Sequence, residues 1–198
     1  MFLAGSGVLD LGSVSLPLCS REVFGSSVPL EIELGVGKGR FLLEWAAAHP
    51  EIGLVGIERV RKYLQIVAAR VARRGLSNVR VVHTTAEDLL FRCLAEGSVA
   101  GVHVYFPDPW PKKRHHKRRF FRASNAARLA TVLAREGLLR VKTDHDGYAA
   151  AIGEVLAGEP RLAPVAAEGV FEGIPETHYE IKYGRERRNV HRLAYRRV

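Results

Sequence analysis

Residues 30–39 of the chain read Leu30-Glu31-Ile32-Glu33-Leu34-Gly35-Val36-Gly37-Lys38-Gly39. An apolar run of strand length is followed at once by a glycine-rich turn, and residues 41–48 then favour a helix. Glycines at such a turn permit positive φ angles and let a ligand approach the backbone closely. The alternative is a tight turn that only packs the helix against the strand. The stretch indicates the first unit of an α/β fold, with a ligand site where the strand ends.

The alternation of strand and helix continues along the chain. Strands are expected at 54–57, 79–82, 102–106, 137–142 and 190–195, and helices at 86–94, 119–134 and 147–156. Val60, Leu64, Val67 and Val71 recur at helical spacing and predict one buried helix face, with Gly75 as the C-cap residue. Residues after Gly158 are less regular. This order predicts a mostly parallel sheet covered on both faces, which binds ligands at the carboxyl ends of its strands.

The composition indicates which class of protein this is and in which cellular compartment it is expected. The 198 residues are 47% hydrophobic and 26% charged, which suits a globular domain and excludes a mostly disordered chain. No apolar run reaches the ~18 residues that span a bilayer. Cys19 and Cys93 form neither a metal-ligand pattern nor a disulfide framework. We therefore expect a cytoplasmic protein without a membrane segment or a metal ion.

The charge is strongly positive. The chain carries 30 Lys and Arg against 21 Asp and Glu, a formal net charge of +9, which indicates a polyanionic partner. The positive residues cluster in two runs, residues 112–122 and residues 182–198.

Two carboxylates near the glycine turn indicate the cofactor class. Glu58 follows the second strand and can accept both hydroxyls of a ribose. Arg40 replaces the third glycine of a dinucleotide fingerprint, and no phosphate-binding Gly-Lys-Ser/Thr loop is present. Glu33 would repel a pyrophosphate but suits a cation. These features favour S-adenosyl-L-methionine, which carries a sulfonium and an ammonium and no phosphate, held by Glu33, Glu58 and the turn glycines Gly35, Gly37 and Gly39.

The third strand ends in His83-Thr84-Thr85-Ala86-Glu87. In a sheet of this kind the position lies beside the adenine, so Thr85 or the backbone at Ala86 can bond the adenine edge. The alternative is that Thr84 or Thr85 caps the following helix.

The fourth strand ends in Pro107-Asp108-Pro109-Trp110-Pro111. Prolines at alternate positions hold the intervening residues extended, so Asp108 is presented at the crevice and Trp110 offers a surface for stacking a base. A basic run follows and can contact several phosphates. The residues expected to touch RNA in this way are Lys113, Arg114, His115, Lys117 and Arg118.

These motifs together resemble the bacterial tRNA (guanine-N7-)-methyltransferase family. The resemblance covers about residues 24–198. The segments that carry it are Phe24-Gly25, Pro29–Gly39, Gly56-Ile57-Glu58, Phe106–His115 with Lys117–Arg119, Lys142-Thr143-Asp144 and Thr177–Lys182. It implies a Rossmann-like, class I S-adenosylmethionine methyltransferase fold with a seven-stranded, mostly parallel sheet whose last strand is antiparallel. It also implies methylation of N7 of guanine 46 in the variable loop of tRNA. Residues 1–23 are expected to form an N-terminal extension to a single methyltransferase domain at 24–198.

The resemblance also implies roles for individual residues. Glu33, Glu58, Thr85 and Asp108 would line the cofactor site, and Asp108 would act in catalysis. Lys112, Asp144, Thr177, Tyr179 and Glu180 would hold the guanine or its nucleotide. Thr85 stands where the family commonly has Asp or Asn, so its adenine contact is expected to differ. Read without the family, Asp144 could cap a helix and Glu180 could be a surface charge.

Two other functions and two oligomeric states remain open. A small-molecule methyltransferase explains the glycine turn but not the basic runs. A non-catalytic RNA-binding module explains the charge but not the carboxylates. The resemblance allows a monomer or a homodimer.

Overall fold

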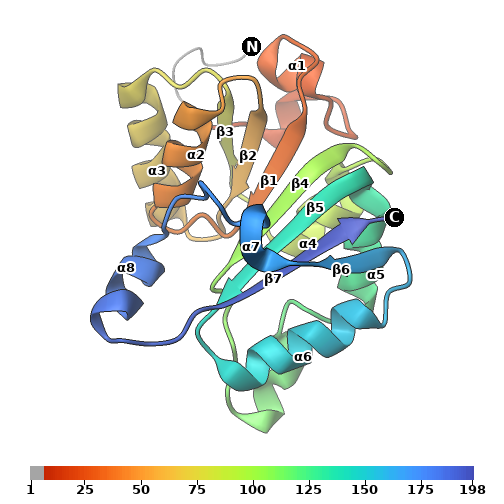
Figure 1. The fold of residues 1–198 in the computed structure, drawn as a ribbon. Helices are drawn as coiled ribbons and strands as arrows, with labels where there is room; N and C mark the ends of the chain where they lie inside the picture. The colour runs from red at the N-terminus through yellow and green to blue at the C-terminus, as the bar shows by residue number, and fades with distance from the viewer. Residues whose placement is uncertain (1–6) are drawn as a thin grey trace.

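The computed structural model describes residues 7–198, which contain a seven-stranded sheet in the order β3-β2-β1-β4-β5-β7-β6 (Figure 1). The strands are β1 (Leu30–Leu34), β2 (Gly53–Ile57), β3 (Val79–Val82), β4 (Val99–Tyr105), β5 (Leu133–Thr143), β6 (Leu162–Val165) and β7 (His191–Arg197). Neighbouring strands from β3 to β5 are parallel, whereas β7 is antiparallel to both β5 and β6. The predicted Rossmann-like sheet with an antiparallel last strand is confirmed.

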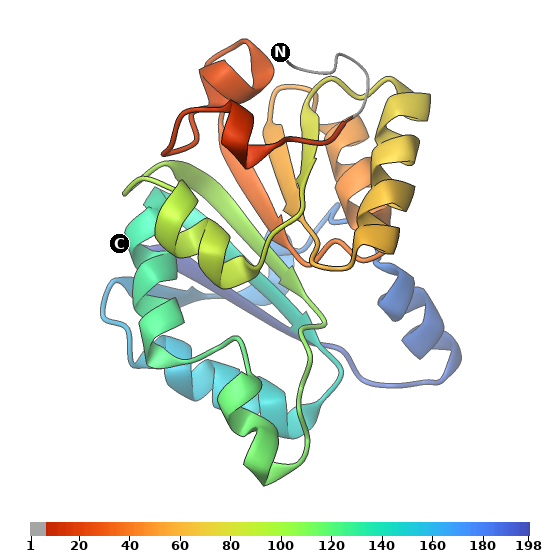
Figure 2. The same ribbon diagram turned by 180° about the vertical axis from the view of Figure 1, so that it is seen from behind.

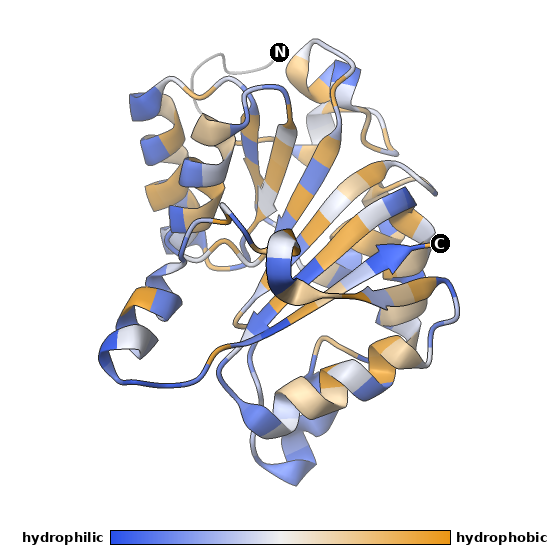
Figure 3. Ribbon diagram, in the orientation of Figure 1, coloured by the Kyte–Doolittle hydropathy of each residue, from blue (hydrophilic) through white to orange (hydrophobic). Residues whose placement is uncertain are grey.

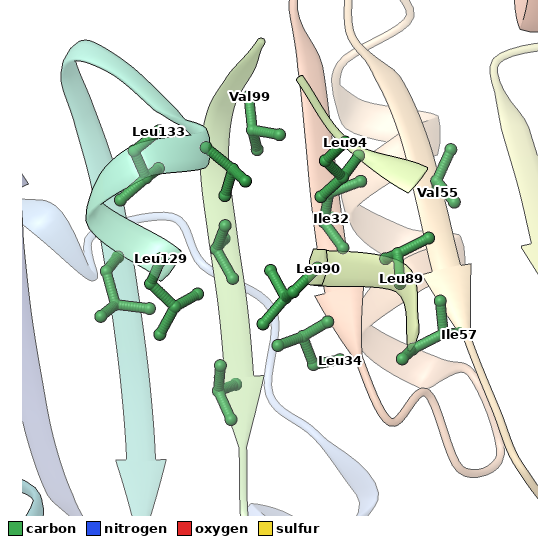
Figure 4. Close-up of a cluster of buried hydrophobic side chains, with 14 of the residues drawn as sticks. Ile32, Leu34, Val55, Ile57, Leu89, Leu90, Leu94, Val99, Leu129 and Leu133 are labelled. Atoms are coloured by element: carbon green, nitrogen blue, oxygen red, sulfur yellow. The ribbon is translucent and has the colours of Figure 1, made fainter. Parts of the chain in front are cut away.

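Helices cover both faces of the sheet, which explains why every residue of β1 and β2 is buried. Helices α2 (Arg40–Ala48) and α3 (Arg61–Arg74) cover one face, and α4 (Ala86–Asp88), α5 (Ala123–Val132) and α6 (Asp146–Ala157) cover the other (Figures 1 and 2). Each face has its own apolar cluster. Figure 4 shows side chains of β1 and β2 packed against Leu89, Leu90 and Leu94, and Figure 3 shows the apolar residues concentrated in the strands and the inner helix faces.

The helix after β2 has the predicted apolar face but begins later than the spacing suggests. Leu64, Val67 and Val71 are buried, and Gly75 ends the helix at φ 64°, where its N–H donates to the carbonyls of Ala72 and Val71. Val60 precedes the helix and is 41% exposed, so its predicted place on the buried face is wrong. Its N–H donates to Glu58, which holds Val60 outside the helix.

The predicted helix at 119–134 is too long at both ends. Arg119 donates from Nε to the carbonyl of Pro109 and lies 4.7 Å from the ring of Tyr148, so the chain reaches α5 as an extended connection. At the other end Leu133 already pairs with Val99, and β5 is correspondingly longer than predicted.

The region after Gly158 is more regular than the sequence suggests. It contains β6, α7 (Ala167–Val170) and α8 (His178–Arg185) before β7. Thr177 caps α8 by accepting from the N–H of Glu180, while Glu180 accepts from the N–H of Thr177. This capping box fixes where α8 begins, and the helix projects from the body of the molecule (Figures 1 and 2).

Residues 7–23 of the predicted N-terminal extension pack against the domain. Gly7 and Leu9 bond to Val81 of β3, and Leu9, Leu18 and Val23 join the apolar cluster of the α4–α6 face. Residues 1–6 of that extension lie outside the described residues. The division at residue 24 stays a prediction. Within residues 7–198, no helix is long and apolar enough to cross a membrane.

Candidate active site

The glycine turn between β1 and α2 forms one wall of the site. Gly35, Gly37 and Gly39 have φ angles of 87°, 50° and 73°, which disfavour residues with side chains. A Cβ on Gly35 or Gly37 would meet nothing within 4 Å, whereas one on Gly39 would lie 2.7 Å from Val67. The first two glycines therefore leave space for a ligand, and the third lets α2 pack against α3.

Two cavities adjoin at Gly35. The first, of about 520 Å³, lies over the ends of β1, β2 and β4 and is lined by predicted residues from four segments: Gly35, Glu58, Thr85, Ala86 and Asp108. The second, of about 360 Å³, lies between the glycine turn and α8 and includes Glu33, Gly37, Thr177 and Tyr179. The strand ends thus bring these predicted residues to one edge of the sheet, as a doubly wound topology requires.

Glu58 is held by the backbone on both sides. Its Oε2 accepts from the N–H of Gly37 at 2.9 Å, and its Oε1 accepts from the N–H of Val60 at 2.8 Å. A carboxylate offers about four lone-pair sites, so two of them stay available to a ligand. The two backbone contacts orient the carboxylate toward the first cavity.

Glu33 is buried at the wall of the second cavity. Its Oε2 has no hydrogen-bond partner among the described residues. Burial, together with the charge of Glu58, raises the pKa of Glu33 well above its ordinary range. A buried carboxylate with an unpaired oxygen is the arrangement that a cationic ligand group would stabilise.

Thr85 caps α4 at the edge of the first cavity. Its hydroxyl accepts from the N–H of Asp88 at 3.1 Å and donates to the Asp88 carboxylate at 2.9 Å. The helix-cap alternative therefore holds for Thr85. Its proton is already used, but one lone pair remains for a ligand donor.

Asp108 lines the first cavity, as its place after β4 predicts, but it is open to solvent. The other residue between the prolines, Trp110, has a φ of 43°, so the prediction that it is extended is wrong. The side chain of Asp108 is 69% exposed, and its Oδ2 lies 3.9 Å from Nη2 of Arg59. Arg59 was not expected at the site. It follows Glu58 directly, but the sequence gives no sign that it faces the proline-rich loop.

The basic run after the loop forms a 3-10 helix over Lys113–Arg118, preceded by Lys112. Arg118 lies 5.0 Å from the ring of Trp110, and His115 meets the same ring edge-on at 5.8 Å. Trp110 is therefore covered in part by two of the residues expected to touch RNA. Lys113, Arg114 and Lys117 are exposed.

Apart from Lys112, which is exposed before the 3-10 helix, the residues expected to hold the guanine divide into two groups. Thr177 and Glu180 form the capping box of α8, and Glu180 is buried against Lys142 at 2.9 Å. The alternative that Glu180 is a surface charge is wrong, because this buried pair anchors α8 to β5. Burial lowers the pKa of Lys142, and the carboxylate of Glu180 opposes that effect. Lys142 was missed as a site-supporting residue, although a lysine in an apolar strand is a signal that it needs a buried partner.

The second group lies nearer the surface. Asp144 bonds to Arg188 at 2.9 Å, and the cap of α6 is His145, so the alternative that Asp144 caps this helix is wrong. Tyr179 is 50% exposed and packs against the rings of Phe106 and Tyr183. Their binding roles stay predictions, as do those of the other candidate residues.

A buried polar network lies next to the second cavity and reaches its wall at Tyr105. Glu31 accepts from Trp45 at 2.8 Å and from His103 at 2.9 Å, and His103 also bonds to the hydroxyl of Tyr105. Burial alone would raise the pKa of Glu31, but the hydrogen bonds from His103 and Trp45 outweigh it and lower that pKa to about 2. The network joins α2 to β1 and β4 and places Tyr105 at the cavity wall.

Comparison with known proteins gives the family. A family model described as "Putative methyltransferase" matches residues 27–193. A tRNA (guanine-N(7)-)-methyltransferase of Alkalilimnicola ehrlichii is 39% identical over 184 residues, which cover 91% of this chain and 78% of that protein. This chain belongs to the tRNA (guanine-N7-)-methyltransferase family.

Other members of this methyltransferase family are longer. The relatives of the same name from Mycobacterium avium and Nocardia farcinica are 39% and 44% identical, over 84% and 74% of this chain. The chain spans 65% of the first relative's length and 54% of the second's.

Solved structures agree on the fold. The 16S rRNA methyltransferase KamB has a TM-score of 0.61 at 17% identity, with 88% of this chain and 90% of that chain covered. A structure titled as an antibiotic related methyltransferase has a TM-score of 0.61 at 18% identity, covering 93% and 98%. In residues 7–198, no group of three or more His, Cys, Asp or Glu side chains is arranged to hold a metal ion.

Proposed function

We propose that this chain transfers a methyl group from S-adenosyl-L-methionine to N7 of guanine 46 in the variable loop of tRNA. The observation that carries the proposal is Glu33 in a chain of this family: its buried carboxylate oxygen lies beside the glycine turn and has no hydrogen-bond partner in the part of the chain that the structure describes. An ammonium group is the ligand that such an oxygen suits. The names of the relatives support the tRNA substrate and the N7 position of guanine.

The two cavities fit the two ends of this cofactor. Glu33 and the backbone of Gly35 and Gly37 would hold the amino-acid end, and the lone pairs left on Glu58 would accept the ribose hydroxyls. Thr85 and Ala86 would bound the adenine, and Gly39 would keep α2 in place. When bound, the cofactor supplies an electrophilic methyl group on a sulfonium.

The proposed reaction requires the protein mainly to align the methyl donor with guanine N7. Guanine N7 has a free lone pair and no proton, so the reaction needs neither a general base nor a metal ion. Positive charge develops on the base during attack, and the carboxylate of Asp108 or Asp144 can stabilise it or accept from the guanine N1–H and amino group. A charge-assisted hydrogen bond contributes about 1.5–3 kcal/mol, roughly one to two decades in rate. The remaining acceleration comes from holding the two reactants in line.

Asp108 is the better candidate for the catalytic carboxylate. Asp144 already bonds to Arg188 at 2.9 Å, whereas the 3.9 Å separation of Asp108 from Arg59 leaves it open to a ligand. Lys112, Tyr179 and the capping box of Thr177 and Glu180 would support the nucleotide around it.

The basic 3-10 helix supplies the contact to RNA. Lys113, Arg114 and Lys117 would bind phosphates directly, and His115 and Arg118 would also fix Trp110. We further propose that residues 24–198 form the methyltransferase domain and that it works on tRNA in the cytoplasm, without a metal ion, as a monomer or homodimer.

The test is transfer of a labelled methyl group to an unmodified tRNA transcript, run beside calorimetric binding of S-adenosyl-L-methionine. Cofactor binding with salt-sensitive transfer to the transcript supports the proposal. Cofactor binding without tRNA binding would instead favour a small-molecule methyltransferase. Binding of tRNA without cofactor binding would favour a non-catalytic RNA-binding module.

A further inference from the structure

The second cavity has a positively charged rim that the proposed reaction does not use. Lys38 and Arg40 stand on one side of it, and His178 and Lys182 on α8 stand on the other. All four are exposed, and Glu33 is the only acidic residue among the described residues that line the cavity. We call this rim the α2–α8 cleft. Lys182 also belongs to the second basic run of the sequence, to which no role has been given.

The geometry of the cleft is held by contacts between its two sides. Arg40 donates from Nε to the carbonyl of Glu176 at 3.0 Å, which ties the start of α2 to the segment before α8. Arg70 donates to the carbonyl of Lys38 at 2.7 Å and fixes the glycine turn from the side of α3. The positive charges are thus brought together by the fold, although they are about 140 residues apart along the chain.

The positive charge of the cleft is poorly neutralised. Partial burial and then the charges of Arg40, Lys38 and Arg70 lower the pKa of His178. Lys182 lies 3.8 Å from Glu186, but that pair is exposed and therefore weak. Lys38, Arg40 and Lys182 together present more charge than one carboxylate of a cofactor can match.

An aromatic surface lies beside these cations. Tyr179, half-exposed on α8, lines the cavity together with Tyr63 and packs against Phe106 at 5.6 Å. Cations along a groove with aromatic rings beside them are typical of sites that bind single-stranded nucleic acid. The combination therefore suits an RNA strand whose bases are not paired.

The cleft and the basic 3-10 helix lie on different sides of the site. Figures 1 and 2 show α8 and the turn at residues 113–118 projecting at separate points, with the carboxyl ends of β4 and β5 between them. RNA that reaches the strand ends would meet positive charge on both sides.

We propose that the α2–α8 cleft is a second phosphate-binding surface for the substrate RNA, opposite the basic 3-10 helix. The inference rests on the proposed function and adds to it. Lys38 and Lys182 contact phosphates of the strand that carries the target base, and Tyr179 lies against an unpaired base. The 3-10 helix binds the strand on the other side, so the target nucleotide is held over Asp108 from both directions.

The test is the salt dependence of tRNA binding by Lys38→Gln/Lys182→Gln. Binding of an unmodified tRNA transcript is measured without cofactor at several salt concentrations, and the slope of log affinity against log salt is compared with that of the unaltered chain. Each lost phosphate contact lowers the slope by about 0.7–0.9, so the double variant should lose roughly 1.4–1.8. At ~0.1 M salt its affinity should fall by about 20- to 60-fold.

The control is Arg73→Gln/Arg135→Gln, which removes the same charge from exposed positions in the last turn of α3 and near the start of β5. Its slope should stay within about 0.3 of the unaltered value. An unchanged slope in Lys38→Gln/Lys182→Gln would overturn the proposal, and so would an equal fall in both variants.

A weaker affinity for S-adenosyl-L-methionine with an unchanged RNA slope would also overturn it, because the cleft would then serve the cofactor. The slopes are measured without turnover. Failure of the unaltered chain to methylate tRNA would therefore reject the proposed function. The salt slopes would still decide whether the α2–α8 cleft binds RNA.

Discussion

Glu33→Gln tests the role of a buried carboxylate. Burial of this carboxylate should lower the stability of the unliganded protein, and its charge should strengthen binding of the cofactor. Within residues 7–198, the buried Oε2 of Glu33 has no hydrogen-bond partner, and burial and the charge of Glu58 hold the pKa of Glu33 well above its ordinary range. A charged group that is buried without a partner costs about 1–3 kcal/mol or more. Glutamine is also polar but carries no charge, so the substitution removes the part of this cost that comes from ionisation. At pH values where Glu33 is ionised, the Tm of the unliganded protein should therefore rise, by at most about 2–12 °C in a chain of this size.

The same substitution should weaken cofactor binding. Loss of a charge-assisted hydrogen bond of about 1.5–3 kcal/mol raises the Kd for S-adenosyl-L-methionine roughly 10- to 150-fold. In the unaltered chain, a proton on Glu33 must leave before its carboxylate can pair with an ammonium. Affinity should therefore rise with pH through the raised pKa of Glu33, and binding should release a proton, whereas Glu33→Gln should do neither.

Calorimetry in two buffers of different ionisation enthalpy measures the Kd and the proton release together, and thermal unfolding gives the Tm. Glu44→Gln, a change to a half-exposed carboxylate of α2 that pairs with Arg74, is the control and should leave the Kd and the proton release unchanged and the Tm nearly so. If Glu33→Gln binds the cofactor with the unaltered affinity and the same dependence on pH, Glu33 does not hold the ammonium group.

Three further predictions concern the other carboxylates. Glu180→Gln leaves Lys142 buried without its counter-charge and should lower the free energy of unfolding by about 3–5 kcal/mol. The control Glu136→Gln, in an exposed pair, should change it by less than ~1 kcal/mol. Equal effects of the two substitutions in chemical denaturation would contradict the buried role of Glu180. The pKa of Glu31 is lowered to about 2 from 4.5, so its charge contributes roughly 3 kcal/mol to the free energy of unfolding above pH 4.5. This contribution is lost as the pH falls toward 2. In Glu31→Gln, the free energy of unfolding should therefore fall less between pH 4.5 and pH 2. Asp108→Ala should reduce turnover at saturating substrates by about 10- to 100-fold, and near-normal turnover would remove Asp108 from the mechanism.

Much of the central sheet could be predicted because β2 and β4 are mostly apolar stretches of strand length, and β1 alternates apolar residues with two glutamates. The carboxylates Glu33 and Glu58 could be found for a related reason, since residues at the ends of parallel strands meet at one edge of a sheet. Their position relative to the glycine turn follows from that topology.

The α8 region could not be predicted in the same way. It has no long apolar run, and its stability comes from the pair between Glu180 and Lys142, which are 38 residues apart. The capping box of Thr177 and Glu180 was nevertheless a readable signal for the start of a helix. The α2–α8 cleft depends on this packing, so its charges could not be grouped from the sequence.

The most direct measurement maps the methylated base in an unmodified tRNA transcript. After incubation with the protein and S-adenosyl-L-methionine, the RNA is cleaved chemically at 7-methylguanine and the product is compared with that from a transcript carrying adenine at position 46. We expect a single cleavage at position 46 of the guanine transcript and none in the adenine transcript. Cleavage at other guanines or in the adenine transcript would contradict the proposed reaction, and so would the absence of cleavage in the guanine transcript.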